Sequence, residues 1–259
     1  MPRAPGNATF NPPDLAGVII PQSKFRRAPA TEPESERVNG ENGQDWAAQR
    51  RAMVDEQIRK RGVRSPRLLE VLERVPRHLF VPEDLVAHAY EDRALGIGDG
   101  QTISQPYMVG AMTEYLGLEG NERVLEVGAG SGYQAAVLSE LAKEVVTVEN
   151  RALLAEAARD RLADLGYRNV HVKLGDGTLG WPEDGPFDAI LVAAAAPAVP
   201  APLVEQLAEG GRMVIPVGNS DKQMLLRIRK LAGEILEEKL FACQFVPLRG
   251  RHGWPDAEK

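Results

Sequence analysis

The sequence is poor in cysteine and has no long uninterrupted apolar run. Among its 259 residues there is one cysteine, Cys243, so no disulfide can form within the chain, and a reducing compartment such as the cytoplasm is expected. The best candidate for a membrane span, residues 190–204, is rich in alanine and broken by Pro197, Pro200 and Pro202. Because about 20 consecutive apolar residues are needed to cross a bilayer, no membrane association is expected. The first residues lack a basic start followed by an apolar stretch, so no secretory signal is predicted.

An excess of basic residues is also missing. The chain has 37 acidic and 31 basic residues, which gives a net charge of −6. A nucleic-acid partner is therefore not predicted, because such proteins present a strongly basic face. The four histidines and Cys243 show no metal-ligand spacing, so no metal site is predicted.

Residues 1–46 differ in composition from the rest of the chain. Seven prolines and four glycines stand among polar residues there, and no apolar periodicity is sustained. Ordering such a segment costs about 1–2 kcal/mol per residue, with little apolar area to offset the cost. We therefore expect a flexible N-terminal tail over residues 1–46 and a folded domain over residues 47–259. The protein is expected to be a monomer.

The folded part begins with helical spacing and continues as an alternation. Two helices are expected on either side of Gly62, the second capped by Ser65 before Pro66 and ended at Val75 and Pro76. Apolar runs then alternate with helical segments. The expected strands are 124–127, 144–148, 170–174, 187–192 and 212–217, and the expected helices are 134–142, 153–165 and 203–207. This order predicts an α/β fold with a doubly wound, mostly parallel sheet. Residues 223–228 and 240–246 are expected to add an antiparallel edge as a hairpin around Gly233, with residues 234–239 as a solvated turn.

A glycine-rich loop follows the first strand of the predicted sheet. Gly128, Gly130 and Gly132 lie between that strand and a helix, and glycines let a ligand approach the backbone closely. The dinucleotide fingerprint requires a third glycine where this sequence has Tyr133. The strand also carries Glu126, whose charge disfavours a pyrophosphate and favours an ammonium group. The loop therefore points to a cationic, phosphate-free nucleoside.

Two more acids stand at strand ends. Glu149 closes the second strand, where a carboxylate can accept the hydroxyls of a ribose. Asp176 follows the third strand and could bind an exocyclic amine of adenine. Carboxyl ends of parallel strands form the ligand edge of such sheets, so a nucleoside site is predicted there. Ordinary strand-to-helix turns are the alternative interpretation of these three acids.

Residues 96–108 precede the sheet and contain Ser104 and Pro106. From the residues alone, Ser104 is expected to be a structural cap for the helix that begins near Pro106.

Several separate segments together resemble protein-L-isoaspartate (D-aspartate) O-methyltransferases. The similar segments are Gln-Thr-Ile-Ser-Gln-Pro at 101–106, Val-Leu-Glu-Val-Gly-Ala-Gly-Ser-Gly-Tyr at 124–133, Gly-Asp-Gly at 175–177, Pro-Phe-Asp-Ala-Ile at 186–190, the alanine-rich turn at 193–197, and residues 210–218 and 245–248. The resemblance covers about residues 47–250 and does not include the tail. It implies a Rossmann-like methyltransferase domain.

The resemblance also implies roles for individual residues. Ser104 matches the active-site position, and residues 101–103 match a loop that closes over cofactor and substrate. The alanine-rich turn matches a substrate-facing loop. The implied binding residues for S-adenosyl-L-methionine are Gln101, Thr102, Ile103, Ser104, Glu126, Gly128, Gly130, Glu149, Asp176 and Gly177, with Glu126 in place of the aspartate of some members.

The implied reaction transfers a methyl group from S-adenosyl-L-methionine to the free α-carboxylate of L-isoaspartyl residues in damaged proteins and peptides. The alternatives are a methyltransferase for a small-molecule or RNA acceptor, a cofactor-binding module without catalysis, and an NAD dehydrogenase.

Overall fold

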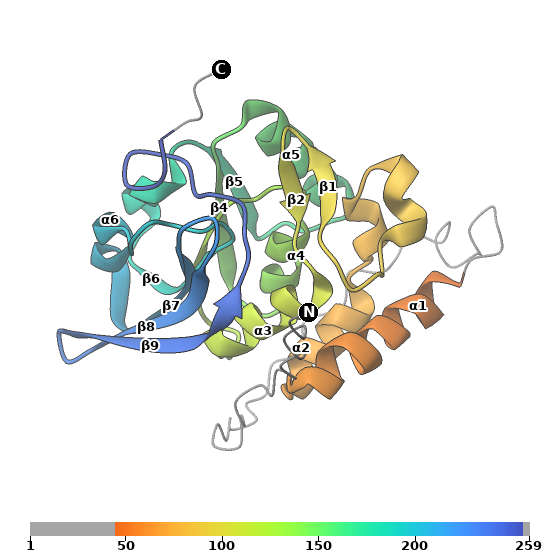
Figure 1. Ribbon diagram of the computed structural model, residues 1–259, viewed down its shortest axis with the longest axis horizontal. Helices are drawn as coiled ribbons and strands as arrows, with labels where there is room; N and C mark the ends of the chain where they lie inside the picture. The colour runs from red at the N-terminus through yellow and green to blue at the C-terminus, as the bar shows by residue number, and fades with distance from the viewer. Residues whose placement is uncertain (1–44, 256–259) are drawn as a thin grey trace, which may run out of the picture.

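The computed structural model describes residues 45–255, and the chain opens there with a helical module (Figure 1). Its helices are α1 Trp46–Ala52, η2 Met53–Ile58, η3 Arg59–Arg61 and α2 Pro66–Arg74. Helical segments lie on both sides of Gly62, as expected. Gly62 ends the first of them in the left-handed conformation, with φ of 102°. The Ser65 hydroxyl accepts from the Leu68 amide at 3.4 Å, which confirms the predicted cap. Of the tail predicted over 1–46, all but Asp45 and Trp46 lies outside the described residues.

A second segment joins this module to the sheet. It contains η4 Arg77–Phe80, η5 Glu83–His88, the strands β1 Leu95–Gly98 and β2 Gln101–Ile103, and helix α3 Pro106–Leu116. β1 and β2 form a small antiparallel hairpin, which was not predicted from the sequence. The expected cap at Ser104 is wrong, because the N-cap of α3 is Gln105 and no side chain caps that end.

The main sheet has seven strands in the order β5-β4-β3-β6-β7-β8-β9. The strands are β3 Arg123–Val127, β4 Glu144–Glu149, β5 Val170–Leu174, β6 Phe187–Val192, β7 Leu207–Gly218, β8 Gln223–Leu231 and β9 Glu234–Cys243, and the helices are α4 Tyr133–Ser139, α5 Ala152–Asp164, η6 Gly177–Leu179, η7 Pro182–Asp184 and α6 Ala201–Glu205. In the sheet, the neighbouring strands β5, β4, β3, β6 and β7 run parallel to one another. β8 pairs antiparallel with β7 and with β9. The predicted doubly wound sheet with an antiparallel edge is confirmed. Its strand order reverses at β3, and ligands of open α/β sheets bind at such a point.

The edge hairpin is longer than the sequence suggested. Leu231 pairs with Glu234, and Ala232 and Gly233 make the turn with φ of 53° and 78°. The solvated turn expected over 234–239 is therefore wrong, since these residues belong to β9. Their side chains are exposed, which explains why a charged segment can form an edge strand. Figure 1 shows this hairpin projecting beyond the body of the sheet.

Apolar side chains fill a layer on each face of the sheet. Val124, Val145 and Leu191 point to the face covered by the helical module, α3 and α4. Leu125 and Val146 point to the other face, where Leu203 of α6 packs. Each buried side chain of this kind contributes about 1.5–3 kcal/mol. Within residues 45–255, no helix has the length and apolar content of a membrane span, and no group of acidic, histidine or cysteine side chains could hold a metal ion.

Candidate functional site

The carboxyl ends of β3 and β4 open into a cavity with an empty volume of about 790 Å³, part of it open to solvent. Ligands of open α/β sheets bind in clefts at this edge. Eight of the ten residues implied as binding residues line it: Gln101, Thr102, Ile103, Ser104, Gly128, Gly130, Glu149 and Gly177. Glu126 and Asp176 are not among its lining residues.

The glycine loop forms the floor of the cavity. Gly128 and Gly130 have φ of 97° and 53°, in the left-handed region that favours glycine. The Gly128 amide donates to the Val148 carbonyl at 2.8 Å, which ties the loop to β4. At Gly128, an added Cβ would meet no atom closer than the Ala193 Cβ at 3.6 Å. The loop therefore presents bare backbone to whatever lies in the cavity.

Glu149 places a carboxylate directly beside this loop. The residue ends β4 and is 6% exposed. Its Oε2 accepts from the Gly130 amide at 2.9 Å, and its Oε1 accepts from the amides of Asn150 and Arg151 at 3.0 and 3.1 Å. A carboxylate has about four acceptor positions. One position on Oε2 thus stays open to a ligand hydroxyl, and a second hydroxyl would displace an amide.

Glu126 lies behind the cavity wall. Its side chain is completely buried, and Oε2 accepts from the Thr147 hydroxyl at 2.5 Å. Its Oε1 is buried without a hydrogen-bond partner among the described residues. Burial raises the pKa of this carboxyl from 4.5 to about 8, although the Thr147 bond acts against the rise. At neutral pH the group is therefore mainly a neutral acid. Of the three acidic residues expected to face the ligand, Glu149 is the one that lines the cavity.

Asp176 serves the loop that follows it. Its Oδ1 accepts from the amide and hydroxyl of Thr178 at 2.9 and 2.6 Å, and its Oδ2 accepts from the Arg251 amide at 2.8 Å. Burial alone would raise its pKa, but these hydrogen bonds lower it below the usual value. The neighbouring Gly177 is the residue that lines the cavity. An added Cβ there would lie 2.5 Å from Val127 Cγ1, so the close packing requires glycine.

The wall opposite the sheet is the β2 strand and the residue that follows it. Gln101, Thr102 and Ile103 form β2, and Ser104 comes next, before α3. The Ser104 side chain makes no hydrogen bond to any residue in the range 45–255. Its hydroxyl is thus available to a ligand in the cavity.

Two further walls come from later in the chain. Ala193 and Ala194 follow β6, and the segment 246–249 lies against them. The Ala195 amide donates to Val246 at 2.8 Å, and the Leu248 amide donates back to Ala195 at 2.8 Å. The alanine-rich turn was expected to face substrate, and it does line the cavity. Arg249 was not predicted as a site residue, although the segment 245–248 directly before it was part of the resemblance.

Other lining residues were not predicted individually, although four of them belong to the 124–133 segment of the resemblance. They are Val109, Val127, Ala129, Ser131, Tyr133, Gln134, Val148, Asn150 and Arg151. Most sit one or two positions from a predicted residue, on the same strand end or helix start.

The residues of the cavity fit S-adenosyl-L-methionine. The bare glycine loop allows a close approach, and Glu149 offers a carboxylate acceptor at the strand end expected for a ribose. Two arginines line the cavity: Arg151 is paired with Asp99 at 2.8 Å, and Arg249 donates to the Pro255 carbonyl.

Comparison with known proteins agrees with this geometry. The sequence profile of the family described as Protein-L-isoaspartate(D-aspartate) O-methyltransferase (PCMT) matches residues 48–253. A protein-L-isoaspartate O-methyltransferase of Trichlorobacter lovleyi is 58% identical over 206 residues, which cover 79% of this chain and 95% of that protein. One from Syntrophus aciditrophicus is 56% identical over 209 residues, with 80% and 96% covered.

Solved structures are similar over the same range. A protein-L-isoaspartate O-methyltransferase structure has a TM-score of 0.72 and 32% identity, with 78% of this chain and 67% of that chain covered. A Plasmodium falciparum structure solved with S-adenosyl-L-homocysteine has a TM-score of 0.68 at 24% identity, with 77% and 98% covered, and it shows the shared fold. With most of its length matched at these identities, the chain belongs to the protein-L-isoaspartate (D-aspartate) O-methyltransferase family.

Proposed function

We propose that this chain transfers a methyl group from S-adenosyl-L-methionine to the free α-carboxylate of L-isoaspartyl residues in proteins and peptides. The observation that carries the proposal is that one cavity joins the glycine loop and Glu149 on one side to the free Ser104 hydroxyl on the other. As a member of its family the chain is a protein carboxyl methyltransferase, and this cavity supplies both a nucleoside site and an acceptor site.

The acceptor needs orientation more than activation. A carboxylate has an ordinary pKa near 4, so it is ionised at neutral pH and needs no general base. When bound, S-adenosyl-L-methionine supplies a methyl group already activated on a sulfonium. The carboxylate oxygen forms the new bond to carbon as the carbon–sulfur bond breaks, and that electron pair stays on sulfur. Alignment of the reacting atoms can contribute up to about 7–11 kcal/mol.

Ser104 is proposed to provide that orientation. Its hydroxyl donates a hydrogen bond to the acceptor carboxylate and does not act as a nucleophile. Gly128, Gly130, Glu149 and Gly177 are proposed to hold the cofactor, with residues 101–103 closing over both ligands. Glu126 and Asp176 contribute by supporting β3 and the loop after β5, because their side chains accept hydrogen bonds from Thr147 and from the Arg251 amide.

Methylation also prepares the repair of the damaged residue. The ester releases methoxide more readily than a carboxylate releases oxide. The neighbouring backbone amide can then close a succinimide, which opens partly to normal aspartate without further help from the protein.

A paired peptide assay tests this function. Mass spectrometry should find a gain of one methylene unit on an isoaspartyl peptide and none on the otherwise identical aspartyl peptide. Methylation of both peptides would point to a different acceptor. Methylation of neither, with S-adenosyl-L-homocysteine binding confirmed by calorimetry, would reject the assigned reaction.

Residues 47–259 are proposed to be the methyltransferase domain, in a cytoplasmic monomer with no nucleic-acid partner. The family match over 48–253, the net charge of −6 and the single cysteine support this proposal. Light scattering measures the oligomeric state, and a filter-binding assay with mixed RNA measures nucleic-acid affinity.

A further inference from the structure

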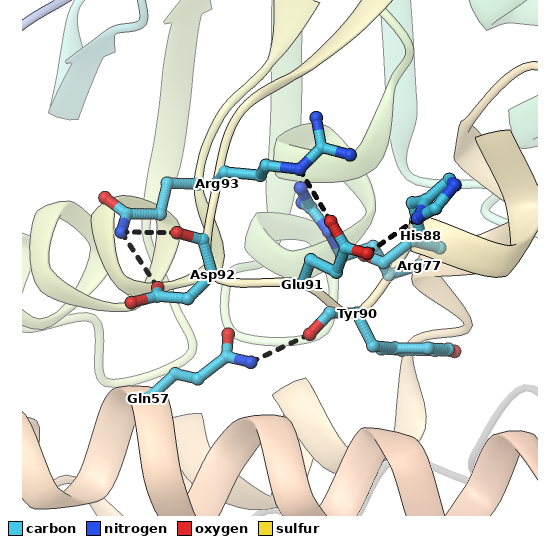
Figure 2. Close-up of polar contacts among 9 residues, drawn as sticks. Gln57, Arg77, His88, Tyr90, Glu91, Asp92 and Arg93 are labelled. Atoms are coloured by element: carbon cyan, nitrogen blue, oxygen red, sulfur yellow. Dashed lines mark hydrogen bonds and ion pairs between the residues drawn. The ribbon is translucent and has the colours of Figure 1, made fainter.

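Arg77 connects the segment that contains Ala89 to two segments that line the cavity, those of Ser104 and Tyr133. It begins η4 and is completely buried. Its Nε donates to the Ala89 carbonyl at 2.7 Å, and its Nη2 donates to the Ser104 carbonyl at 2.8 Å. Its guanidinium carbon also lies 5.0 Å from the ring centre of Tyr133, the first residue of the helix after the glycine loop. Figure 2 shows Arg77 beside the segment from His88 to Arg93.

The charge of Arg77 is not balanced by a carboxylate. Within residues 45–255 Arg77 forms no ion pair, and the side chain of Tyr133 beside its guanidinium favours the charged form. Burial lowers the pKa of the guanidinium from 12.5 to about 10, so the group stays charged at neutral pH. A buried, unpaired cation is destabilising, and an apolar side chain of similar volume would fill the space at lower cost. A role beyond packing is therefore expected.

Arg77 is also placed where a charge would matter. Among the described residues, it is the side chain that bonds the main chain of Ser104. On the solvent side, Gln105 is held separately, because its Nε2 donates to the Asp92 carboxylate at 2.8 Å. Arg77 thus fixes the inner side of the loop at the main chain of Ser104, a residue that lines the cavity.

We propose that Arg77 is a positioning residue for methyl transfer: it fixes the Ser104 main chain so that the hydroxyl points into the cavity, and its buried positive charge favours a carboxylate there. This inference rests on the proposed role of Ser104. Arg77 touches neither ligand and acts through the loop. A purely structural Arg77 would instead stabilise the whole protein without favouring one ligand.

A double-mutant cycle separates these two roles. Arg77→Lys keeps the charge and one possible hydrogen bond but loses the fork that reaches both carbonyls. It should lower kcat/KM for an isoaspartyl peptide by about tenfold while changing the affinity for S-adenosyl-L-homocysteine less than about twofold. In a Ser104→Ala background the same change should cost less than about threefold, because the group that it positions is gone. Equal losses in both backgrounds, or a matching loss of cofactor affinity, would overturn the proposal.

Arg50→Lys is the matched control. Arg50 is also buried, at 4% exposure, and it donates through Nε to the Glu73 carbonyl at 2.8 Å and through Nη1 to the Tyr90 hydroxyl at 3.3 Å. This variant should lose stability without losing kcat/KM.

A measurement on the unmutated protein covers the case in which the Arg77 variants do not fold. The guanidinium resonances of Arg77, assigned through their contact with the Tyr133 ring, should shift when isoaspartyl peptide is added to the complex with S-adenosyl-L-homocysteine. The aspartyl peptide should cause no shift, and unchanged resonances with both peptides would reject the proposal. Failure of the wild-type protein to methylate the isoaspartyl peptide would reject the function itself, so the two failures are distinguishable.

Discussion

Asp99 and Arg151 form an ion pair of 2.8 Å that joins the turn of the β1–β2 hairpin to the start of α5. The hairpin carries residues 101–103, and Arg151 follows Glu149 and Asn150, which line the cavity at the end of β4. The pair therefore connects the wall that holds Ser104 to the wall that holds Glu149.

Asp99→Asn should weaken this connection without unfolding the protein. The two side chains are 49% and 34% exposed, so the ion pair contributes at most about 1 kcal/mol and is screened by salt. Asparagine also tolerates the φ of 51° at this position. We expect KM for the isoaspartyl peptide to rise a few-fold in low salt, and the difference from wild type to shrink in high salt. Asp55→Asn, which removes an exposed pair with Arg59 on the helical module, should leave KM unchanged. Steady-state kinetics at two salt concentrations decides the point.

Ser104→Ala should damage catalysis and leave the fold intact. A hydrogen bond to a charged group contributes about 1.5–3 kcal/mol, so kcat/KM should fall by roughly 10- to 100-fold. The melting temperature should stay the same, because the hydroxyl makes no hydrogen bond among the described residues. Ser65→Ala should show the opposite pattern, with about 1 kcal/mol of stability lost with its helix cap and full activity kept. Full activity in a folded Ser104→Ala protein would remove Ser104 from the mechanism.

Gly128→Ala should lose cofactor affinity beyond its cost in stability. Left-handed backbone costs an alanine about 1–2 kcal/mol, and the new methyl group would stand in the cavity. Gly117→Ala is the matched control, because Gly117 has φ of 57° and open space around its Cβ position at the end of α3. Both variants should be destabilised alike, while calorimetry should find S-adenosyl-L-homocysteine bound at least about tenfold more weakly by Gly128→Ala alone, or ~1.4 kcal/mol. Equal affinity in the two variants would show that the loop does not contact the cofactor.

Glu126 should give the protein a pH-dependent stability. Its folded pKa is about 8 against an ordinary 4.5, so between these values the folded protein holds a proton that the unfolded chain has released. The free energy of unfolding therefore falls as pH rises through this window, by up to about 1.4 kcal/mol per pH unit, and levels off above it.

Glu126→Gln should remove that dependence, because an amide does not titrate. Urea unfolding at several pH values measures the difference, with Glu156→Gln on the exposed side of α5 as a control that keeps the wild-type slope. Parallel curves for wild type and Glu126→Gln would mean that the carboxyl is not held as a neutral acid.

Much of the fold could be predicted from the sequence because its signals are local. Ser65 with Pro66 marked a helix start, and the apolar runs marked β3 to β6. The β1–β2 hairpin could not be predicted, because its glycines give no apolar alternation. The length of β9 was missed for a related reason, since the charges that resembled a solvated turn lie on an exposed edge strand.

The site was predicted at the level of segments and less well at the level of side chains. Residues 101–104, the glycine loop and Glu149 do meet in one cavity. Glu126 lies on the same face of β3 as Val124, and its complete burial was missed because both faces of the sheet are covered, which the strand pattern alone did not show. Arg249 lies far along the chain from Gly128, and its segment is brought to the cavity by tertiary contacts, which include the bridge between Ala195 and Pro247 and the hydrogen bond from the Arg251 amide to Asp176.

The segment 246–249 is also the last part of the cavity wall to be synthesised. Synthesis runs from the N-terminus, so Ser104, the glycine loop and Glu149 leave the ribosome while the segment 246–249 does not yet exist. A nascent chain of that length contains the carboxyl ends of β3 and β4 but lacks the wall of the cavity that residues 246–249 form. The cavity therefore gains this wall only after residues 246–249 have emerged, however early the central strands fold.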